Sequence, residues 1–71
     1  MQKEEKMNEI GTIAGKIWET LNTEGEMTVS KLLKLTDEKR DLVLMALGWL
    51  AREDKLEAET RKNAIYYSLK K

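Results

Sequence analysis

The sequence contains no cysteine, no histidine and no proline among its 71 residues. Without cysteine or histidine the chain can form no disulfide, and it has no thiol nucleophile, no thiolate or imidazole metal ligand and no imidazole base. Ser30 and Ser68 therefore have no base to activate them. The four glycines are scattered, and none follows a predicted strand into a helix as in a phosphate-binding loop. We expect a non-enzymatic protein with no catalytic residue, no metal and no cofactor.

Long apolar runs are also missing. The longest nearly apolar run, residues 42–51, is about half of the ~20 residues that a membrane-spanning helix requires, so we interpret it as a core helix. Residues 1–6 carry acids and are followed by no apolar segment, which argues against a secretory signal. The expected location is the cytoplasm, without contact with a membrane.

An excess of positive charge is the third missing feature. Thirteen basic and thirteen acidic residues cancel, whereas a dedicated nucleic-acid binder usually has a positive excess on at least one face. At 41% hydrophobic and 37% charged, the composition is that of a soluble, folded chain. A chain of 71 residues is near the lower limit for one core without disulfides or metals, so a partner subunit could supply further burial.

Helical periodicity defines the first part of the chain. The apolar residues Ile10, Ala14, Ile17 and Leu21 recur at steps of three and four, which predicts a helix from an N-cap at Asn8 to a position before Gly25. Residues 26–28 are too few for more than an isolated β-bridge.

Two further helices are predicted after this bridge. Thr28 is a suitable N-cap for a short helix over residues 29–35, which would bury Val29, Leu32 and Leu33. Thr36, followed by two acids, is a second helix start signal, and the third helix would extend to about residue 54. Its core stripe is predicted to consist of Val43, Ala46, Leu47 and Leu50.

The pattern changes to period two at Lys55 and predicts a β-hairpin. Leu56 and Ala58 alternate with glutamates, the polar residues 61–64 form the turn, and residues 65–69 are rich in strand-forming types. The fold class is therefore mainly α with a small β-hairpin. The order of three helices, a short β-bridge and a two-stranded wing predicts a winged helix-turn-helix. We expect one domain over residues 7–69, a frayed segment over residues 1–6 and a tail at residues 70–71.

Two stretches support this assignment by resemblance. Residues 10–18 (IGTIAGKIW) and 46–56 (ALGWLAREDKL) resemble short stand-alone bacterial winged helix-turn-helix proteins that form a domain family of unknown function. The resemblance covers roughly residues 7–69 and implies the fold and a bacterial cytoplasm, but no activity. Winged helices at large imply DNA binding through the third helix and the wing, an inference that rests on the fold alone.

The outward face of the third helix is poorly suited to reading DNA. Helical rotation turns Asp37, Asp41, Met45, Gly48 and Arg52 outward, whereas base and phosphate readout requires Arg, Lys, Asn or Gln. Residues 36–54 hold five acids and three bases, so the would-be recognition helix is acidic.

Basic residues near this helix and on the wing are nevertheless candidates for phosphate contact, or else ordinary solvated charges. The candidate DNA contacts are Lys31, Lys34, Lys39, Arg40, Arg52, Arg61 and Lys62.

Two small and aromatic clusters are candidates for a protein interface, or alternatively for packing within the domain. Gly11, Gly15 and Trp18 share one face of the first helix, and a glycine inside a helix costs roughly 1 kcal/mol relative to alanine. Met45 and Gly48 on the third helix, flanked by Leu44 and Trp49, form the second cluster.

Two hypotheses follow from these residues. In the first, the module acts by protein–protein contact, most simply as a homodimer, in a transcription-associated context. In the second, it binds double-stranded DNA through phosphate contacts from the third helix and the basic wing. The acidic third helix favours protein contact.

Overall fold

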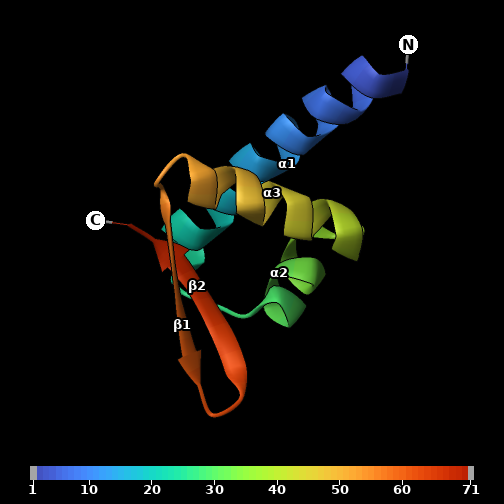
Figure 1. The fold of residues 1–71 in the computed structure, drawn as a ribbon. Helices are drawn as coiled ribbons and strands as arrows, with labels where there is room; N and C mark the ends of the chain where they lie inside the picture. Colours follow the sequence, from blue (N-terminus) through green and yellow to red (C-terminus); the bar gives the residue numbers. More distant parts are fainter. Residues whose placement is uncertain (1, 71) are drawn as a thin grey trace.

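The structure, a computed structural model, describes the backbone of residues 2–70 and the side chains of residues 9–70. Three helices are followed by one antiparallel hairpin: α1 (Gln2–Glu24), α2 (Val29–Thr36), α3 (Arg40–Arg52), β1 (Leu56–Arg61) and β2 (Ala64–Leu69). Figure 1 shows the hairpin extending from the helices on the side away from the N-terminal end of α1. The predicted winged helix-turn-helix architecture is confirmed.

Helix α1 begins earlier than its apolar stripe predicts. It is helical from Gln2, so Asn8 lies within the helix and the prediction that Asn8 is its N-cap is wrong. The physical reason is helix propensity, because residues 2–7 (QKEEKM) are all of types that favour helices. The proposed division of the chain at residues 7 and 69 stays a prediction, and Met1 and Lys71 lie outside the described residues. At the other end, Gly25 adopts a positive φ of 88° and donates its N–H to the carbonyl of Leu21, which closes α1.

Helix α2 is capped as predicted, but the start of α3 is not. The Thr28 hydroxyl accepts a hydrogen bond from the Lys31 N–H at the beginning of α2. Thr36 was predicted to open α3, yet it is the last residue of α2, and its buried hydroxyl donates to the Leu32 carbonyl at 2.7 Å. Asp37 ends α2 with a left-handed φ of 55°, and α3 begins only at Arg40, with Lys39 as an N-cap that has no side-chain hydrogen bond.

The hairpin has a two-residue turn. Lys62 and Asn63 both have positive φ, of 48° and 71°, which is the backbone of the type I′ turn that matches the right-handed twist of paired strands. Leu56 pairs with Leu69 and Arg61 with Ala64 at the two ends of the ladder. The predicted isolated bridge is present as well, since Met27 exchanges two backbone hydrogen bonds with Tyr67.

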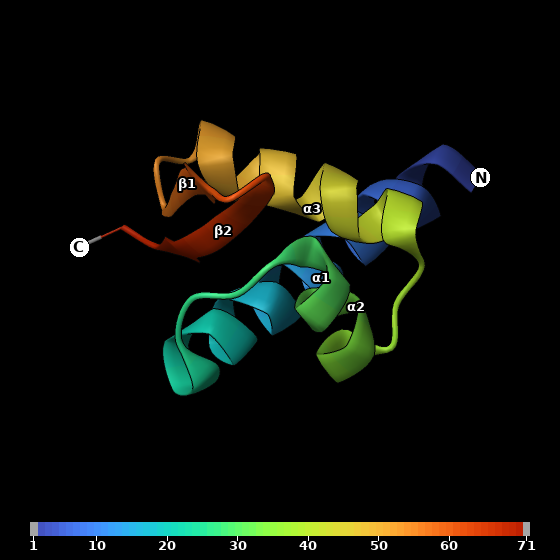
Figure 2. The same ribbon diagram turned by 90° about the horizontal axis from the view of Figure 1, so that it is seen from below.

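The core lies where the three helices meet. Figure 2 shows α3 on one side of α1, with α2 packed beneath them and β2 alongside. The predicted stripes of α1 and α3 are buried, and so is Ile13, which their spacing did not include. Of the three α2 residues predicted to be buried, only Leu32 is, while Val29 and Leu33 pack against the core as partly buried residues. No helix within residues 2–70 is long and apolar enough to cross a membrane.

Candidate interaction surface on helices α1 and α3

The outward face of α3 is apolar at its centre. Met45 has 54% of its surface exposed and Leu44 has 41%. Gly48, about one helical turn further along α3, is exposed as well. The predicted outward residues Asp37, Asp41 and Arg52 are exposed as well. Exposed methionine and leucine side chains around a bare backbone position form a surface that water solvates poorly and a protein partner can cover.

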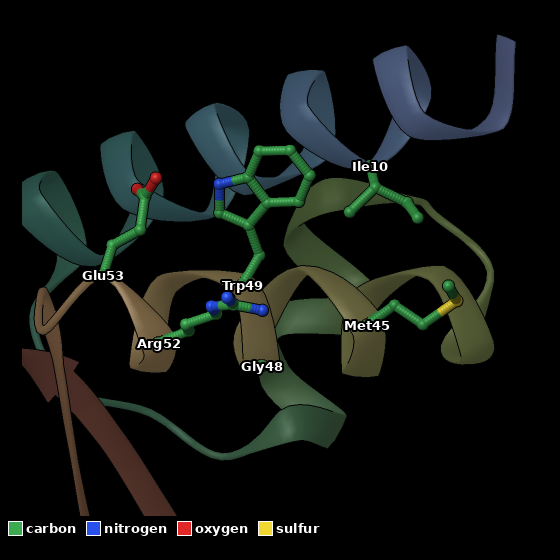
Figure 3. Close-up of a pocket in the computed structure, with 6 residues that line it drawn as sticks. All are labelled: Ile10, Met45, Gly48, Trp49, Arg52 and Glu53. Carbon is green, nitrogen blue, oxygen red and sulfur yellow. The ribbon is translucent and has the colours of Figure 1, made fainter. Parts of the chain in front are cut away.

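Trp49 joins this face to α1. Its indole reaches across to Gly11, where its Cη2 and Cζ2 atoms lie 3.9 Å from the position that a β-carbon would occupy. Figure 3 shows the ring standing between the two helices, pointing from α3 toward α1. The interpretation of Trp49 as a packing residue is therefore partly correct, because the side chain is half-buried but still lines an open surface.

Two concavities adjoin at this indole. The first, of about 640 Å³, is lined by Ile10 of α1 and by residues of α3 that include Met45, Gly48 and Arg52 (Figure 3). The second, of about 350 Å³, runs further along α1 and is lined by Gly11, Gly15, Trp18 and Glu19 on that helix. Trp49 and Glu53 line both. The two candidate interface clusters, which the sequence presents as alternatives, thus lie on one continuous surface.

The glycines on this surface are not required by packing inside the domain. A β-carbon at Gly15 or at Gly48 would meet no heavy atom within 4 Å, and at Gly11 it would make only an ordinary contact with Trp49. Each glycine nevertheless costs roughly 1 kcal/mol of helix stability relative to alanine. The space over Gly15 and Gly48 is open to another molecule.

A third concavity lies on the other side of α3, toward the wing. It has a volume of about 310 Å³ and is lined by Leu44, Gly48 and Ala51 of α3 and by Leu56 and Ala58 of β1. Gly48 therefore borders a hollow on each side, and α3 forms a ridge between them.

The candidate DNA contacts come from three parts of the fold. All are exposed, with Lys31 and Lys34 on α2, Lys39 and Arg40 at the start of α3, Arg52 at its end, and Arg61 and Lys62 at the wing tip. Among residues 9–70, six of them make no ion pair, and Arg61 is the exception.

Arg61 is held by three groups of its own domain. Its guanidinium donates to the carboxylate of Glu26, lies 3.2 Å from Glu59 and stacks 4.5 Å from the centre of the Tyr66 ring. The hydrogen bond to Glu26 raises the pKa of Arg61 above its ordinary value. Desolvation acts in the opposite direction, and the charges of Glu26 and Glu59 add to the increase. Arg61 thus ties the wing to the segment after α1 and is not a free cation at the wing tip.

Further exposed ion pairs fasten other junctions of the fold. Lys16 Nζ lies 2.7 Å from Glu38, which connects α1 to the α2–α3 turn, and Lys70 Nζ lies 2.6 Å from Asp54. The hydrogen bond from Lys70 to Asp54 raises the pKa of the lysine. Among residues 9–70 no cluster of three or more acidic side chains is placed to hold a metal ion.

Comparison with known proteins agrees with this fold. The family described as "Winged helix-turn-helix domain (DUF2582)" matches residues 1–69. The chain belongs to the DUF2582 family. An uncharacterized protein of Methanocaldococcus jannaschii is 43% identical to this DUF2582 domain over 56 residues, which cover 75% of this chain and 79% of that protein. Because this relative is archaeal, the bacterial setting implied by the resemblance is not confirmed.

Sequence reasoning identified the glycines and aromatic residues of this surface but missed its charged rim. Glu19 and Glu53 line the second concavity together with Trp18 and Trp49, and this concavity is called the cleft below. Arg52, considered in the sequence analysis for DNA contact and as an outward residue of α3, lines the first concavity. The spacing of these charged residues along each helix does not predict that they lie beside the two tryptophans, because that arrangement depends on how α1 and α3 cross.

Proposed function

We propose that this winged-helix module is non-enzymatic and acts in the cytoplasm by protein–protein contact, as a homodimer in a transcription-associated context. The interface is the outward face of α3 together with the adjoining concavity on α1. The observation that carries this proposal is the exposure of Met45 and Leu44 around Gly48, beside a hollow walled by Trp49.

Gly48 suits a close crossing of two α3 helices. An isologous dimer places the same residues on both sides of a two-fold axis. With no side chain at Gly48, the two helix backbones can approach closely there, and Met45 of each copy can enter the concavity beside Trp49 of the other. Methionine suits such a role because its flexible thioether fills irregular hollows.

The size of the surface is consistent with this arrangement. A stable interface buries about 800 Å² on each partner, which is roughly 15% of the 5326 Å² of accessible surface of this domain. Helix α3 has 13 residues and is therefore about 20 Å long and about 10 Å across, which is too small to supply that area alone. The proposed interface therefore includes the flanking concavities. Burial of this kind also suits a chain whose own core is close to the minimum size.

Paired substitutions of exposed apolar residues test the proposal. Met45→Glu should abolish self-association, whereas Ile65→Glu, at an apolar wing residue of similar exposure (46%), should not. Sedimentation equilibrium at several concentrations measures both, and circular dichroism verifies that each variant is folded. A wild-type protein that is monomeric at all concentrations contradicts the proposal.

A second candidate function, phosphate contact with duplex DNA, is favoured by the start of α3. The first helical hydrogen bond there runs from the Val43 N–H to the Lys39 carbonyl, so the N–H groups of residues 40–42 have no partner within the helix. No side chain caps them, and Lys39 and Arg40 stand beside them without an ion pair among the described residues. Lys31 and Lys34 of α2 add two exposed charges that make no ion pair within residues 9–70.

Duplex titration at about 50 and 200 mM salt tests this second function. Phosphate contacts give an affinity that falls steeply with salt. The double variant Lys39→Ala/Arg40→Ala should weaken binding and lower the salt slope, whereas Arg61→Ala should change it little, because Arg61 is already paired with Glu26. If the wild type shows no salt-sensitive binding to duplex DNA, the second candidate function is wrong.

A further inference from the structure

We infer that the cleft between Trp18 and Trp49 is a binding site for a guanidinium group, and that its occupant is Arg52 of a second copy of this chain. This inference rests on the proposed homodimer and names the contact that fixes its register. Neither helix alone contains the site, because Trp18 and Glu19 come from α1 while Trp49 and Glu53 come from α3 and its C-cap.

The cleft has the chemistry that a cation requires. Two indoles line it, Trp18 with 37% of its surface exposed and Trp49 half-buried, and tryptophan is the aromatic residue that attracts cations most strongly through its ring face. The carboxylates of Glu19 and Glu53 lie on the same lining. Gly15 leaves room between them, since a β-carbon there would meet nothing within 4 Å.

The cleft also carries an unbalanced negative charge. Glu19 makes no ion pair within residues 9–70, and Glu53 is matched only by Lys55, at 3.5 Å between side chains that are each about half exposed. Two carboxylates and one ammonium group therefore leave one negative charge in the lining. An exposed pair at that separation contributes little, so Lys55 can give way to a better-fitting cation.

The chain itself shows how it holds a guanidinium elsewhere. Arg61 stacks 4.5 Å from the centre of the Tyr66 ring and pairs with two carboxylates, Glu26 and Glu59. The Trp18–Trp49 cleft offers the same combination, an aromatic face and two carboxylates, without a guanidinium of its own in the lining. A planar guanidinium stacks on a ring and donates to carboxylates at once, which an ammonium group cannot do equally well.

Arg52 is the cation that a second copy would present. It is exposed, makes no ion pair among the described residues, and lines the concavity that shares Trp49 and Glu53 with the cleft. In an isologous dimer one surface must supply both the donor and the acceptor of every contact. This surface supplies both, because Arg52 is the donor and the adjacent cleft, with its carboxylates and indoles, is the acceptor. Arg52 of each copy would enter the cleft of the other, which gives two symmetric contacts.

Charge reversal with matched controls tests the inference. Arg52→Glu and Glu19→Arg should each weaken self-association about a hundredfold, since each removes two contacts worth about tenfold apiece. An equimolar mixture of the two variants should associate more tightly than either alone, because one native contact and one reversed contact form in the mixed dimer. Lys62→Glu in the wing turn and Glu24→Arg at the end of α1 make the same changes of charge at exposed positions off α3 and off the cleft, so they should leave self-association unchanged.

Sedimentation equilibrium, with circular dichroism to verify folding, separates the outcomes. If Arg52→Glu and Glu19→Arg self-associate like the wild type while Met45→Glu does not, the guanidinium contact is wrong and the homodimer stands. If both variants are weakened but their mixture shows no recovery, Arg52 does not meet this cleft. A wild type that remains monomeric overturns both the inference and the homodimer.

Discussion

The indole of Trp49 on α3 lies against Gly11 on α1, with two ring carbons 3.9 Å from the position of a β-carbon at residue 11. This contact joins the two surface clusters of the domain, because the concavity beside Met45 and the cleft beside Trp18 share the same ring as a wall. It also makes Trp49 both a packing residue and a surface residue, so its substitution should lower the free energy of unfolding as well as alter the surface.

Replacing Trp49 should destabilise the domain more than replacing Trp18. Trp49→Ala removes a half-buried ring from the α1–α3 contact, and we expect a loss of about 2–3 kcal/mol in the free energy of unfolding, below the range for a fully buried aromatic residue. Trp18→Ala removes a ring that is 37% exposed and should cost about 1 kcal/mol. Urea denaturation of the two variants measures the difference, and equal losses would contradict this assignment of Trp49.

Gly48→Ala should stabilise the monomer while weakening the dimer. Alanine is a better helix former by roughly 1 kcal/mol, and nothing within the domain lies within 4 Å of the added β-carbon. The same methyl group would separate two helices that cross at this position. Urea denaturation at low concentration measures the first effect, and sedimentation equilibrium measures the second.

Thr23→Ala is the matched control for that experiment. It raises helix propensity at an exposed position of α1 away from the proposed interface, so it should increase stability without changing self-association. If Gly48→Ala leaves self-association unchanged, the two α3 helices do not cross closely at Gly48.

The sequence predicted the fold well where a single stripe or cap determines an element. The apolar steps of α1, the Thr28 cap and the change to period two at Lys55 each depend on residues close together in the chain. The prediction for Thr36 was wrong because its hydroxyl can either accept a hydrogen bond as the N-cap of α3 or donate one to a carbonyl of α2. In the structure Thr36 is buried against the core and donates to the Leu32 carbonyl.

The candidate surface was predicted only in parts. The sequence identified the glycine and tryptophan clusters on the first and third helices as separate candidates. It could not predict that the two clusters adjoin, because that depends on how α1 and α3 cross. The pairing of Arg61 with Glu26 joins residues 35 positions apart and was likewise outside the reach of periodicity.

A side-chain cap added to α3 should stabilise the domain. Lys39 occupies the N-cap with extended backbone angles of −68° and 141° but makes no cap hydrogen bond. Lys39→Ser supplies a hydroxyl that can accept from the first turn, so we expect a gain of about 0.5–1 kcal/mol. Thr28→Ala, which removes the existing cap of α2, should lose about 1 kcal/mol in the same thermal or urea unfolding assay.

The pairing of Lys70 with Asp54 should contribute stability that disappears at high pH. The pKa of Lys70 is raised in the folded state by its hydrogen bond to Asp54, so its contribution is fully present below the unfolded-state lysine pKa of about 10.4. It is lost as the pH rises through the higher folded-state value. The difference in melting temperature between the wild type and Asp54→Asn should therefore shrink as the pH rises above about 10.4, and a constant difference would show that this pair contributes nothing.

Sedimentation equilibrium of the wild type beside Met45→Glu and Ile65→Glu tests the central claim most directly. Both residues are exposed, by 54% and 46%, but only Met45 lies on the proposed α3 interface. We expect a concentration-dependent dimer for the wild type and Ile65→Glu, and a folded monomer for Met45→Glu. A wild type that stays monomeric, or a Met45→Glu variant that dimerises as tightly as the wild type, contradicts it.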